Sequence, residues 1–338
     1  MKKFLVIGSN SFSGSHFISN ALDHGYEVLG VSRSKELDYI FLPYLWKRDN
    51  QKSIKLLENN FTFHKIDLNF QLKELMEIVE TFKPTHIVNF AAQGMVAESW
   101  LDPTHWFQTN VVSQVALHDQ LRKKKFLEKY VHVTTPEVYG STDKAWIKED
   151  HRFSPSTPYA VSRASCDLHL KSFCDAYQFP VVFTRAANVY GPGQQLYRVI
   201  PRTILSAKTG KNFELHGEGA SERSFIHITD VVKATLQLAL EAEPGSTWHL
   251  STRNSISIKN LVKKICNLTS VSFEEIVNIS EDRLGKDQSY LLDSSAIRLK
   301  YNWKDKINLE DGILDTVTWI DKHIDKFQKM SWKYIHKK

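Results

Sequence analysis

Short apolar runs, rich in Val, Ile and Phe, recur along the chain from its start to about Asn188. They lie at Lys3–Gly8, Tyr26–Ser32, Phe61–Asp67, Thr85–Ala92, Lys129–Thr135 and Pro180–Ala187. Continuous apolar runs of this length are typical of strands that are buried on both faces of a sheet. Between them, apolar residues recur at helical spacing, as at Leu72, Leu75, Met76 and Val79. This alternation predicts an α/β fold, a doubly wound parallel sheet with helices on both faces.

The regular alternation ends after Asn188. A loop marked by Gly and Pro is followed by a predicted helix near Ile200–Lys208, a strand near Phe213–His216 and an amphipathic helix with its N-cap expected at Thr229 or Asp230. We expect a larger domain made of residues 1–187 plus about 227–250, and a smaller mixed C-terminal lobe made of about 188–226 plus 251–330. No low-complexity linker separates the two parts, so we expect them to pack tightly around a cleft.

Composition narrows the classes of function. Lys and Arg number 44 against 38 Asp and Glu in 338 residues, a formal net charge of +6. This mild excess suits an anionic small ligand, and the absence of a basic stripe interleaved with aromatic residues argues against nucleic acid. The three cysteines form no CxxC pair, which is typical of reduced thiols in a cytosolic protein.

Two further classes are disfavoured by the sequence. No apolar run approaches the ~18 residues that span a bilayer, and the first run is too short for a signal peptide. We therefore expect a soluble, cytoplasmic protein with no membrane partner. The histidines lack the spacing of metal ligands, so no metal is predicted.

The segment VIGSNSFSGSHF follows the first predicted strand and opens the first predicted helix, which includes Phe12. It places Gly8, Ser11 and Gly14 at GxxGxxG spacing, with serine at the middle position. In such a loop the first glycine permits a tight turn and the last lets the helix pack on the strand, while N–H groups at the helix start face a pyrophosphate. The segment predicts a dinucleotide cofactor, and Ser11 bears on how closely the backbone approaches its phosphates.

The ends of the second and third predicted strands bear on the choice of cofactor. An acidic residue after the second strand would bind the adenosine ribose of NAD, but the sequence there is GVSRSKE, with Ser32, Arg33 and Ser34. A guanidinium flanked by hydroxyl groups suits a 2′-phosphate, so NADP is the predicted cofactor and NAD the alternative. Asp67 and Leu68 at the end of the third strand are also predicted cofactor positions, and we expect Asp67 to contact the adenine amino group.

Further motifs follow the glycine loop in a fixed order. They are NFAAQGMVAES at Asn89–Ser99, TNV at Thr109–Val111, TTPEVYG at Thr134–Gly140, PYAVSRAS at Pro158–Ser165, RAANVYGPGQ at Arg185–Gln194, SERSFIHITDV at Ser221–Val231 and DRLGKDQSYLLD at Asp282–Asp293. Over most of its length the chain thus resembles the extended short-chain dehydrogenase/reductases, in particular their nucleotide-sugar 4,6-dehydratases and epimerases. The resemblance implies a Rossmann domain that binds the cofactor and a smaller lobe that binds a nucleotide-diphosphate sugar.

The resemblance also implies catalytic roles. In this family the tyrosine of a YxxxK motif takes the proton of the sugar C4 hydroxyl while hydride passes to the nicotinamide, and a Ser or Thr holds that hydroxyl. Tyr159 and Thr135 occupy these positions. Arg163 replaces the lysine, one helical turn beyond Tyr159, and we expect its fixed charge to favour the Tyr159 phenolate while its contact with the nicotinamide ribose is altered.

A second dehydratase motif, T-D-E, supplies an aspartic acid that protonates the departing C6 hydroxyl and a glutamate that removes the C5 proton. This chain has Thr135-Pro136-Glu137, so the base is retained and the acid is missing. Glu137 then serves both steps, or a water or another side chain donates the proton, or the reaction is not a 4,6-dehydration. The preferred interpretation is an NAD(P)-dependent nucleotide-sugar 4,6-dehydratase; the alternatives are an epimerase, a decarboxylase and a non-catalytic NADP-binding sensor.

The resemblance extends to the substrate and to assembly. Arginine forks in particular suit the phosphate oxygens of a nucleotide sugar. The substrate-contacting positions of the family are occupied here by Gln93, Asn188, Arg198, Arg223, Arg283 and Tyr290, and a cofactor-contacting position by Ala91. Helices near His105–Lys123 and Tyr159–Tyr177 pair across a two-fold axis in many relatives, which implies a homodimer.

Overall fold

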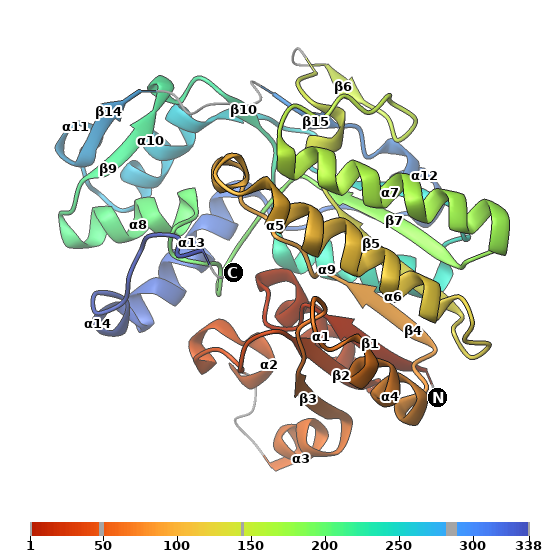
Figure 1. Ribbon diagram of the computed structural model, residues 1–338. Coiled ribbons are helices and arrows are strands. Elements are labelled where there is room, and N and C mark those ends of the chain that lie inside the picture. Colours follow the sequence, from red (N-terminus) through yellow and green to blue (C-terminus); the bar gives the residue numbers. More distant parts are fainter. Residues whose placement is uncertain (1, 47–50, 143–144, 282–288, 337–338) are drawn as a thin grey trace.

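The computed structural model describes residues 2–46, 51–142, 145–281 and 289–336, and its main sheet has seven parallel strands (Figure 1). In spatial order the strands are β12 (Thr247–Leu250), β7 (Val181–Ala186), β5 (Lys129–Thr134), β4 (His86–Asn89), β1 (Lys3–Ile7), β2 (Glu27–Ser32) and β3 (Phe61–Lys65). All but β12 fall within the predicted apolar runs. The doubly wound parallel sheet expected from those runs is therefore confirmed.

Helices cover both faces of this sheet. Because neighbouring side chains of a strand point to opposite faces, β1 serves two cores at once. Phe4 and Val6 pack against one layer of helices, and Leu5 and Ile7 against the other. The first layer consists of α1 (Phe12–Asp23) and α9 (Ile228–Glu241), and the second of α4 (Leu72–Phe82), α6 (Ser113–Leu121) and α7 (Pro158–Tyr177).

The start of α9 differs from the prediction. Its N-cap is His227, whose Nδ1 accepts a hydrogen bond from the backbone N–H of Thr229 at 3.3 Å. The expected caps, Thr229 and Asp230, thus lie inside the first turn because a histidine ring does the capping. Asp230 instead accepts hydrogen bonds at 3.0 Å from the backbone N–H groups of Lys306 and Ile307, which ties a late segment to α9.

A smaller lobe lies beside the carboxyl ends of the sheet strands and has apolar cores of its own. The predicted helix and strand after Asn188 are both present, as α8 and β9. The lobe contains α8 (Val199–Thr209), β9 (Phe213–His216), α10 (Ile258–Leu268), α11 (Phe273–Ile276), β14 (Val277–Ser280), α13 (Leu309–Lys322) and α14 (Ile324–Phe327).

Short elements complete the described fold. Four two-stranded pairs join segments that are distant in the sequence: β8 (Asn188–Tyr190) with β11 (Phe225–His227), β10 (Glu222–Arg223) with β13 (Ile256–Ser257), β6 (Trp146–Ile147) with β15 (Leu291–Leu292), and β9 with β14. The remaining α-helices of the described residues are α2 (Pro43–Trp46), α3 (Gln51–Asn60), α5 (Pro103–Phe107) and α12 (Ser295–Tyr301). Among the described residues, no helix has both the length and the apolar character needed to cross a bilayer.

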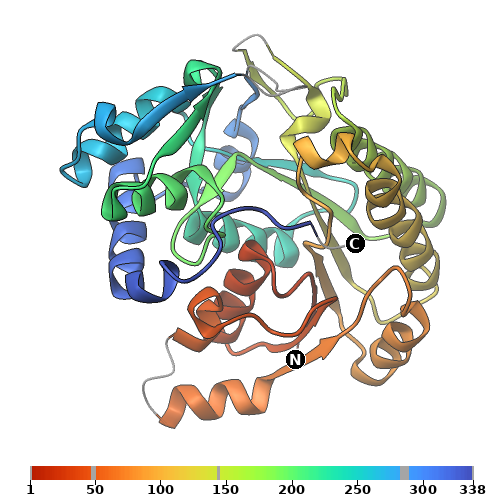
Figure 2. The same ribbon diagram turned by 60° about the vertical axis from the view of Figure 1, so that its left-hand side comes forward.

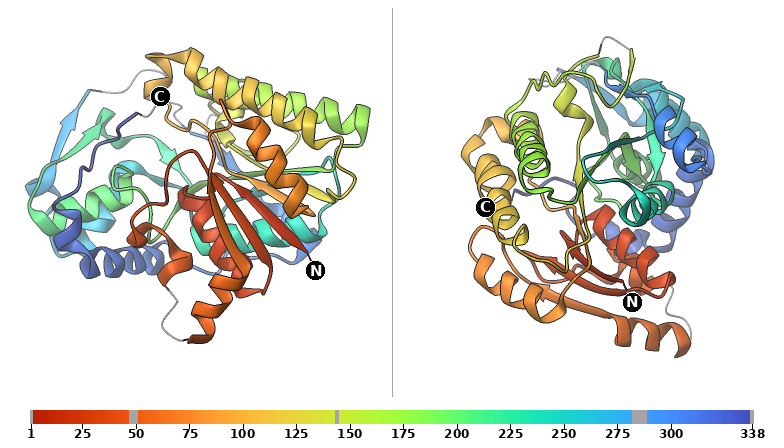
Figure 3. Two further views of the ribbon diagram at one scale, coloured as in Figure 1. Left: turned by 60° about the horizontal axis from the view of Figure 1, so that its bottom comes forward. Right: turned by 90° about the vertical axis from the view of Figure 1, so that its right-hand side faces the viewer.

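The C-terminal tail, residues 331–336, crosses from the smaller lobe to α5 (Figures 2 and 3). At its start Trp332 is buried, and its carbonyl oxygen accepts a hydrogen bond from Arg202 at 2.6 Å. At its end the ring of His336 stacks on Trp106 with 4.9 Å between ring centres, and its Nε2 lies 2.8 Å from Nδ1 of His105. The tail therefore connects the two parts of the molecule.

Candidate active site

The loop after β1 requires glycine at its two outer positions. Gly8 has a φ of +83°, and a Cβ on it would lie 2.8 Å from the backbone nitrogen of Ala91. A Cβ on Gly14 would lie 2.3 Å from the carbonyl oxygen of Gly8. Ser11 is the N-cap of α1: its Oγ accepts from the N–H of Gly14 at 3.0 Å and donates to the carbonyl of Gly8 at 2.7 Å. The serine at the middle position thus closes the loop onto the helix start.

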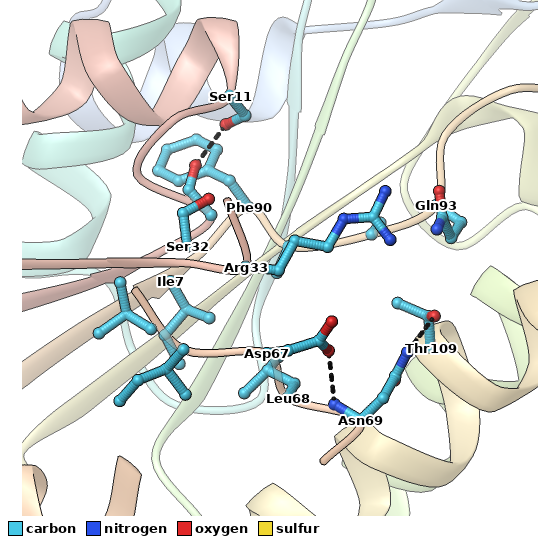
Figure 4. A pocket seen from close by; sticks show the side chains of 15 residues that line it. Ile7, Ser11, Ser32, Arg33, Asp67, Leu68, Asn69, Phe90, Gln93 and Thr109 are labelled. Atoms are coloured by element: carbon cyan, nitrogen blue, oxygen red, sulfur yellow. Dashed lines mark hydrogen bonds between the residues drawn. The ribbon is translucent and has the colours of Figure 1, made fainter. Parts of the chain in front are cut away.

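A pocket opens beside this loop, at the carboxyl ends of β1 to β4 (Figure 4). Such strand ends are the usual ligand site of an open α/β sheet. The predicted site residues that line the pocket are Gly8, Ser11, Ser32, Arg33, Asp67, Leu68, Ala91 and Gln93. Asn69 and Thr109 line it as well, although the sequence predicted no site role for either, and the Asn69 amide donates to the Thr109 hydroxyl at 3.1 Å. The available signal for Asn69 was a second polar residue, two positions after Asp67 at the predicted strand end.

The other predicted cofactor positions do not line this pocket. Phe12 is buried in the core beneath α1, and Gly14 lies under the loop against Gly8. The carbonyl of Ser34 accepts a hydrogen bond at 2.9 Å from the Asn10 amide, which anchors the chain after β2. These residues therefore shape the loop around the pocket.

Arg33 extends into the pocket in the direction of Gln93 (Figure 4). Its Nη1 is buried and has no hydrogen-bond partner among the described residues. A buried donor without an acceptor is costly, and an anionic ligand group in the pocket would satisfy it. Together with the glycine loop, which leaves room for no Cβ at its turn, these features fit the adenosine-phosphate part of a dinucleotide.

Tyr159 lies in the first turn of α7, and three neighbours hold that turn. Thr157 is the N-cap, and its Oγ1 accepts from the N–H of Ala160 at 3.1 Å. Pro158 follows at the first helical position, where its fixed φ suits a helix. The backbone N–H of Tyr159 donates to the hydroxyl of Ser99 at 3.2 Å. These contacts fix Tyr159 beside the segment that follows β4.

The Tyr159 phenol lies between groups of opposite charge. Burial and the Glu137 carboxylate raise its pKa above the ordinary value, while Arg163, a hydrogen bond with Thr135 and Arg198 act in the lowering direction. Arg163 therefore favours the phenolate as expected, but in the protein alone burial and Glu137 outweigh it. The other three predicted catalytic residues, Thr135, Glu137 and Arg163, thus all act on Tyr159.

Arg163 is almost fully buried behind Tyr159, with 2% of its surface exposed. Its Nη2 donates to the carbonyl oxygen of Val133 at 2.5 Å, and its buried Nε has no acceptor among the described residues. Asp167, one turn further along α7, accepts from Arg185 at 2.8 Å. Burial would raise the pKa of Asp167, but Arg185, His132 and Arg163 outweigh it and hold that pKa below the ordinary value.

The buried pair of Asp167 and Arg185 was not predicted from the sequence. Its signals were Arg185 within the apolar run of β7 and Asp167 on the same helix face as Arg163.

Three of the predicted substrate residues form a group in which Tyr290 contacts Glu137. Glu137 follows Pro136 in a tight turn after β5. The Tyr290 hydroxyl lies 3.4 Å from Oε1 of Glu137 and 3.1 Å from Oδ1 of Asn188. The Arg223 guanidinium lies over the ring of Tyr290, 4.3 Å from its centre. Pairing of β15 with β6 brings Tyr290 to this place although 153 residues separate it from Glu137.

The remaining predicted substrate residues are spread more widely. Arg198 is exposed at the start of α8, and its charge acts on Tyr159 across the cleft. Gln93 lies on the cofactor side, where its amide nitrogen is 3.3 Å from Nε2 of His105. Arg283 lies outside the described residues.

Comparisons with known proteins agree with this arrangement. The chain is similar to the dTDP-D-glucose 4,6-dehydratase of Mus musculus, 30% identical over 343 residues that cover 99% of this chain and 92% of that protein. A trifunctional UDP-glucose 4,6-dehydratase, epimerase and reductase of Arabidopsis thaliana is 29% identical over 324 residues, 94% of this chain and 47% of that protein. The chain thus spans about half the length of that relative.

A solved structure and a family model also show similarity to nucleotide-sugar dehydratases. A dTDP-glucose 4,6-dehydratase from Streptomyces venezuelae with NAD and TYD bound has a TM-score of 0.85 and 25% identity, and the match covers 96% of this chain and 98% of that one. The model of the family described as GDP-mannose 4,6 dehydratase matches residues 5–316. The resemblance to nucleotide-sugar dehydratases and epimerases is therefore confirmed, and the chain belongs to the GDP-mannose 4,6 dehydratase family.

Proposed function

We propose that the chain is an NADP-dependent nucleotide-sugar 4,6-dehydratase. The observation that carries the proposal is the position of Glu137, close enough to raise the pKa of Tyr159 and in contact with Tyr290 beside Asn188. A base for C5 is thereby held next to the base for C4. An enzyme that only inverts C4 has no need of this carboxylate.

The side chains divide the reaction between them. Tyr159 takes the proton of the C4 hydroxyl, which Thr135 orients, and Arg163 stabilises the phenolate that this requires. A nicotinamide cofactor held in the pocket lined by Gly8, Arg33 and Asp67 would supply the hydride chemistry, oxidation at C4 followed by reduction at C6. Once C4 is a ketone its neighbouring C5 proton is acidic, and Glu137 removes it. Arg223 and Asn188 are suited to hold the nucleotide diphosphate.

The first test measures conversion of dTDP-glucose, UDP-glucose and GDP-mannose by product mass. Loss of water supports dehydration, whereas unchanged mass with a new sugar NMR spectrum would favour an epimerase, the candidate that the missing acid at Pro136 supports. Glu137→Gln should lower C5 proton exchange with D₂O by at least about 10²-fold, the typical contribution of a general base. Glu128→Gln, on an exposed carboxylate outside the site, is the matched control; full exchange in Glu137→Gln would remove Glu137 from this role.

The preference for NADP rests on Arg33 and its buried Nη1 without a partner among the described residues. A charge-assisted hydrogen bond contributes about 1.5–3 kcal/mol, so Arg33→Ala should weaken NADP binding by roughly 10- to 100-fold and leave NAD binding unchanged. Calorimetric titration of both cofactors measures this, with the exposed neighbour Lys35→Ala as control. Equal weakening of NAD and NADP would contradict the assignment.

We also propose a homodimer in the cytoplasm. The outer surface of α7 exposes Val161 and Leu168, and Phe107 and Val112 lie exposed on the neighbouring helical segment. Apolar side chains gathered on adjacent helices are typical of a subunit interface. The three unpaired thiols support a reducing compartment. Sedimentation velocity of the purified chain tests the assembly; a monomer across the concentration range would refute it.

A further inference from the structure

The proposed dehydration requires a proton donor that the strand end does not supply. Elimination across C5 and C6 expels the C6 hydroxyl, which leaves as water only if it is protonated. Position 136 is a proline, whose side chain has no acidic proton and whose backbone has no N–H. The following inference rests on the proposed function and concerns which side chain supplies this proton.

The Tyr290 hydroxyl is placed next to the base that acts at C5. It lies 3.4 Å from Oε1 of Glu137, and the carbon that carries the leaving hydroxyl is the direct neighbour of C5. Oδ1 of Asn188, 3.1 Å away, is a second acceptor for the same hydroxyl and helps to hold it at this place. The Arg223 guanidinium over the ring puts a positive charge beside the phenol, which stabilises a transient phenolate.

The other described side chains at this place are poor donors. The Asn188 amide and the guanidinium groups of Arg223 and Arg198 do not release protons near neutral pH. Thr135 is an aliphatic alcohol and therefore a weak acid. Tyr159, which is hydrogen-bonded to Thr135, already exchanges a proton with the C4 hydroxyl. Tyr290 is the remaining described group here, apart from Glu137 itself, that carries a proton which can be transferred.

We propose that Tyr290 is the general acid of the elimination, replacing the acid absent at Pro136. Glu137 takes the C5 proton, and the electron pair of that bond forms the C5–C6 double bond as the C6–O bond breaks. Tyr290 gives its proton to the departing oxygen, which leaves as water, and regains one from the Glu137 carboxyl across their contact. C6 then receives the hydride removed from C4, C5 takes a proton from solvent, and Tyr159 releases the C4 hydroxyl proton to solvent. The sum is the loss of one water.

Tyr290→Phe tests the role because it keeps the ring against Arg223 and removes only the hydroxyl. The variant is incubated with whichever of dTDP-glucose, UDP-glucose and GDP-mannose the wild-type chain dehydrates. We expect water loss to fall by about 10²–10⁴-fold, the usual contribution of a general acid. In D₂O the recovered substrate should still acquire deuterium at C5, because Tyr159 and Glu137 are intact. Binding of the corresponding nucleoside diphosphate, measured by calorimetry, should be unchanged.

Controls separate the possible outcomes. Tyr177→Phe, the same change at an exposed position of α7, should behave as wild type. Recovery of water loss in the double variant Y290F/P136D, which restores a carboxylic acid at position 136, would support the assignment. Water loss at the wild-type rate in Tyr290→Phe would overturn it and leave the proposed function standing. A parallel fall of water loss, C5 exchange and diphosphate binding would also overturn it, because Tyr290 would then only bind substrate. Failure of the wild-type chain to dehydrate any of the three sugars would instead refute the proposed function itself.

Discussion

At the scale of single residues, the site depends on a balance of charges around Tyr159. Its pKa is raised by burial and by Glu137 and is lowered by Arg163 and Arg198. The Glu137 carboxylate and the Arg163 guanidinium therefore shift the pKa of Tyr159 in opposite directions. A shift of one pKa unit corresponds to about 1.4 kcal/mol. Loss of either charge should shift the pKa of Tyr159 and with it the pH range in which the enzyme is active.

Arg163 offers the clearest test of this balance. Tyr159 must be deprotonated to accept the C4 hydroxyl proton, so the rate rises as pH passes through its pKa. Arg163→Met removes a charge that lowers this pKa, so the rising limb of kcat/KM against pH should move to higher pH. Activity at neutral pH should fall by at least about tenfold, one pKa unit or more.

Arg163→Lys is the matched control, because it keeps the charge and restores the residue usual in the family. It should retain the wild-type position of the limb more closely than the methionine variant. If the limb of Arg163→Met stays where it is in the wild type, Arg163 does not act through the pKa of Tyr159.

At the scale of elements, helices and strands that depend on the local sequence pattern could be predicted. Features that depend on tertiary contacts could not. Helix α7 was expected near Tyr159–Tyr177 and spans Pro158–Tyr177 because cap, proline and apolar spacing agree locally. Strand β12 escaped notice because its buried His249 interrupts the apolar run. The helical segment expected near His105–Lys123 is present, and it consists of α5, a π-helical turn at Gln108–Val112 and α6 in direct succession.

That π-helical turn has a function in the site which no periodicity reveals. It contains Thr109, which lines the cofactor pocket, and Asn110, whose side chain binds the backbone of Gln93 and the hydroxyl of Ser162. Wider turns of this kind often occur at functional sites because they redirect side chains from the regular helix face. The candidate catalytic residues were within reach of sequence motifs, whereas the contact of Tyr290 with Glu137 depends on strand pairing across 153 residues.

At the scale of the whole molecule, the C-terminal tail links the smaller lobe to the cofactor domain. Trp332 belongs to the apolar core of the smaller lobe, where its Nε1 donates to the carbonyl of Phe327 at 2.7 Å, and the tail ends with His336 on Trp106. His105, which His336 contacts, in turn approaches Gln93 at the cofactor pocket. The tail backbone from Trp332 to His336 therefore joins the core of the smaller lobe to side chains that reach the cofactor pocket.

The anchoring of this tail predicts a large loss of stability from one substitution. Trp332 is 7% exposed and packs under Arg202 and Lys211, whose charged groups lie over its ring. Truncation of a buried Trp leaves a cavity, so Trp332→Ala should lower the free energy of unfolding by about 3–5 kcal/mol, as measured by urea denaturation. Ile335→Ala, in the same tail but 67% exposed, should change it by no more than about 0.5 kcal/mol. The two residues are only three positions apart in the same tail. Equal losses of stability would therefore mean that Trp332 does not anchor the tail on the smaller lobe. Other contacts would then have to link that lobe to the cofactor pocket.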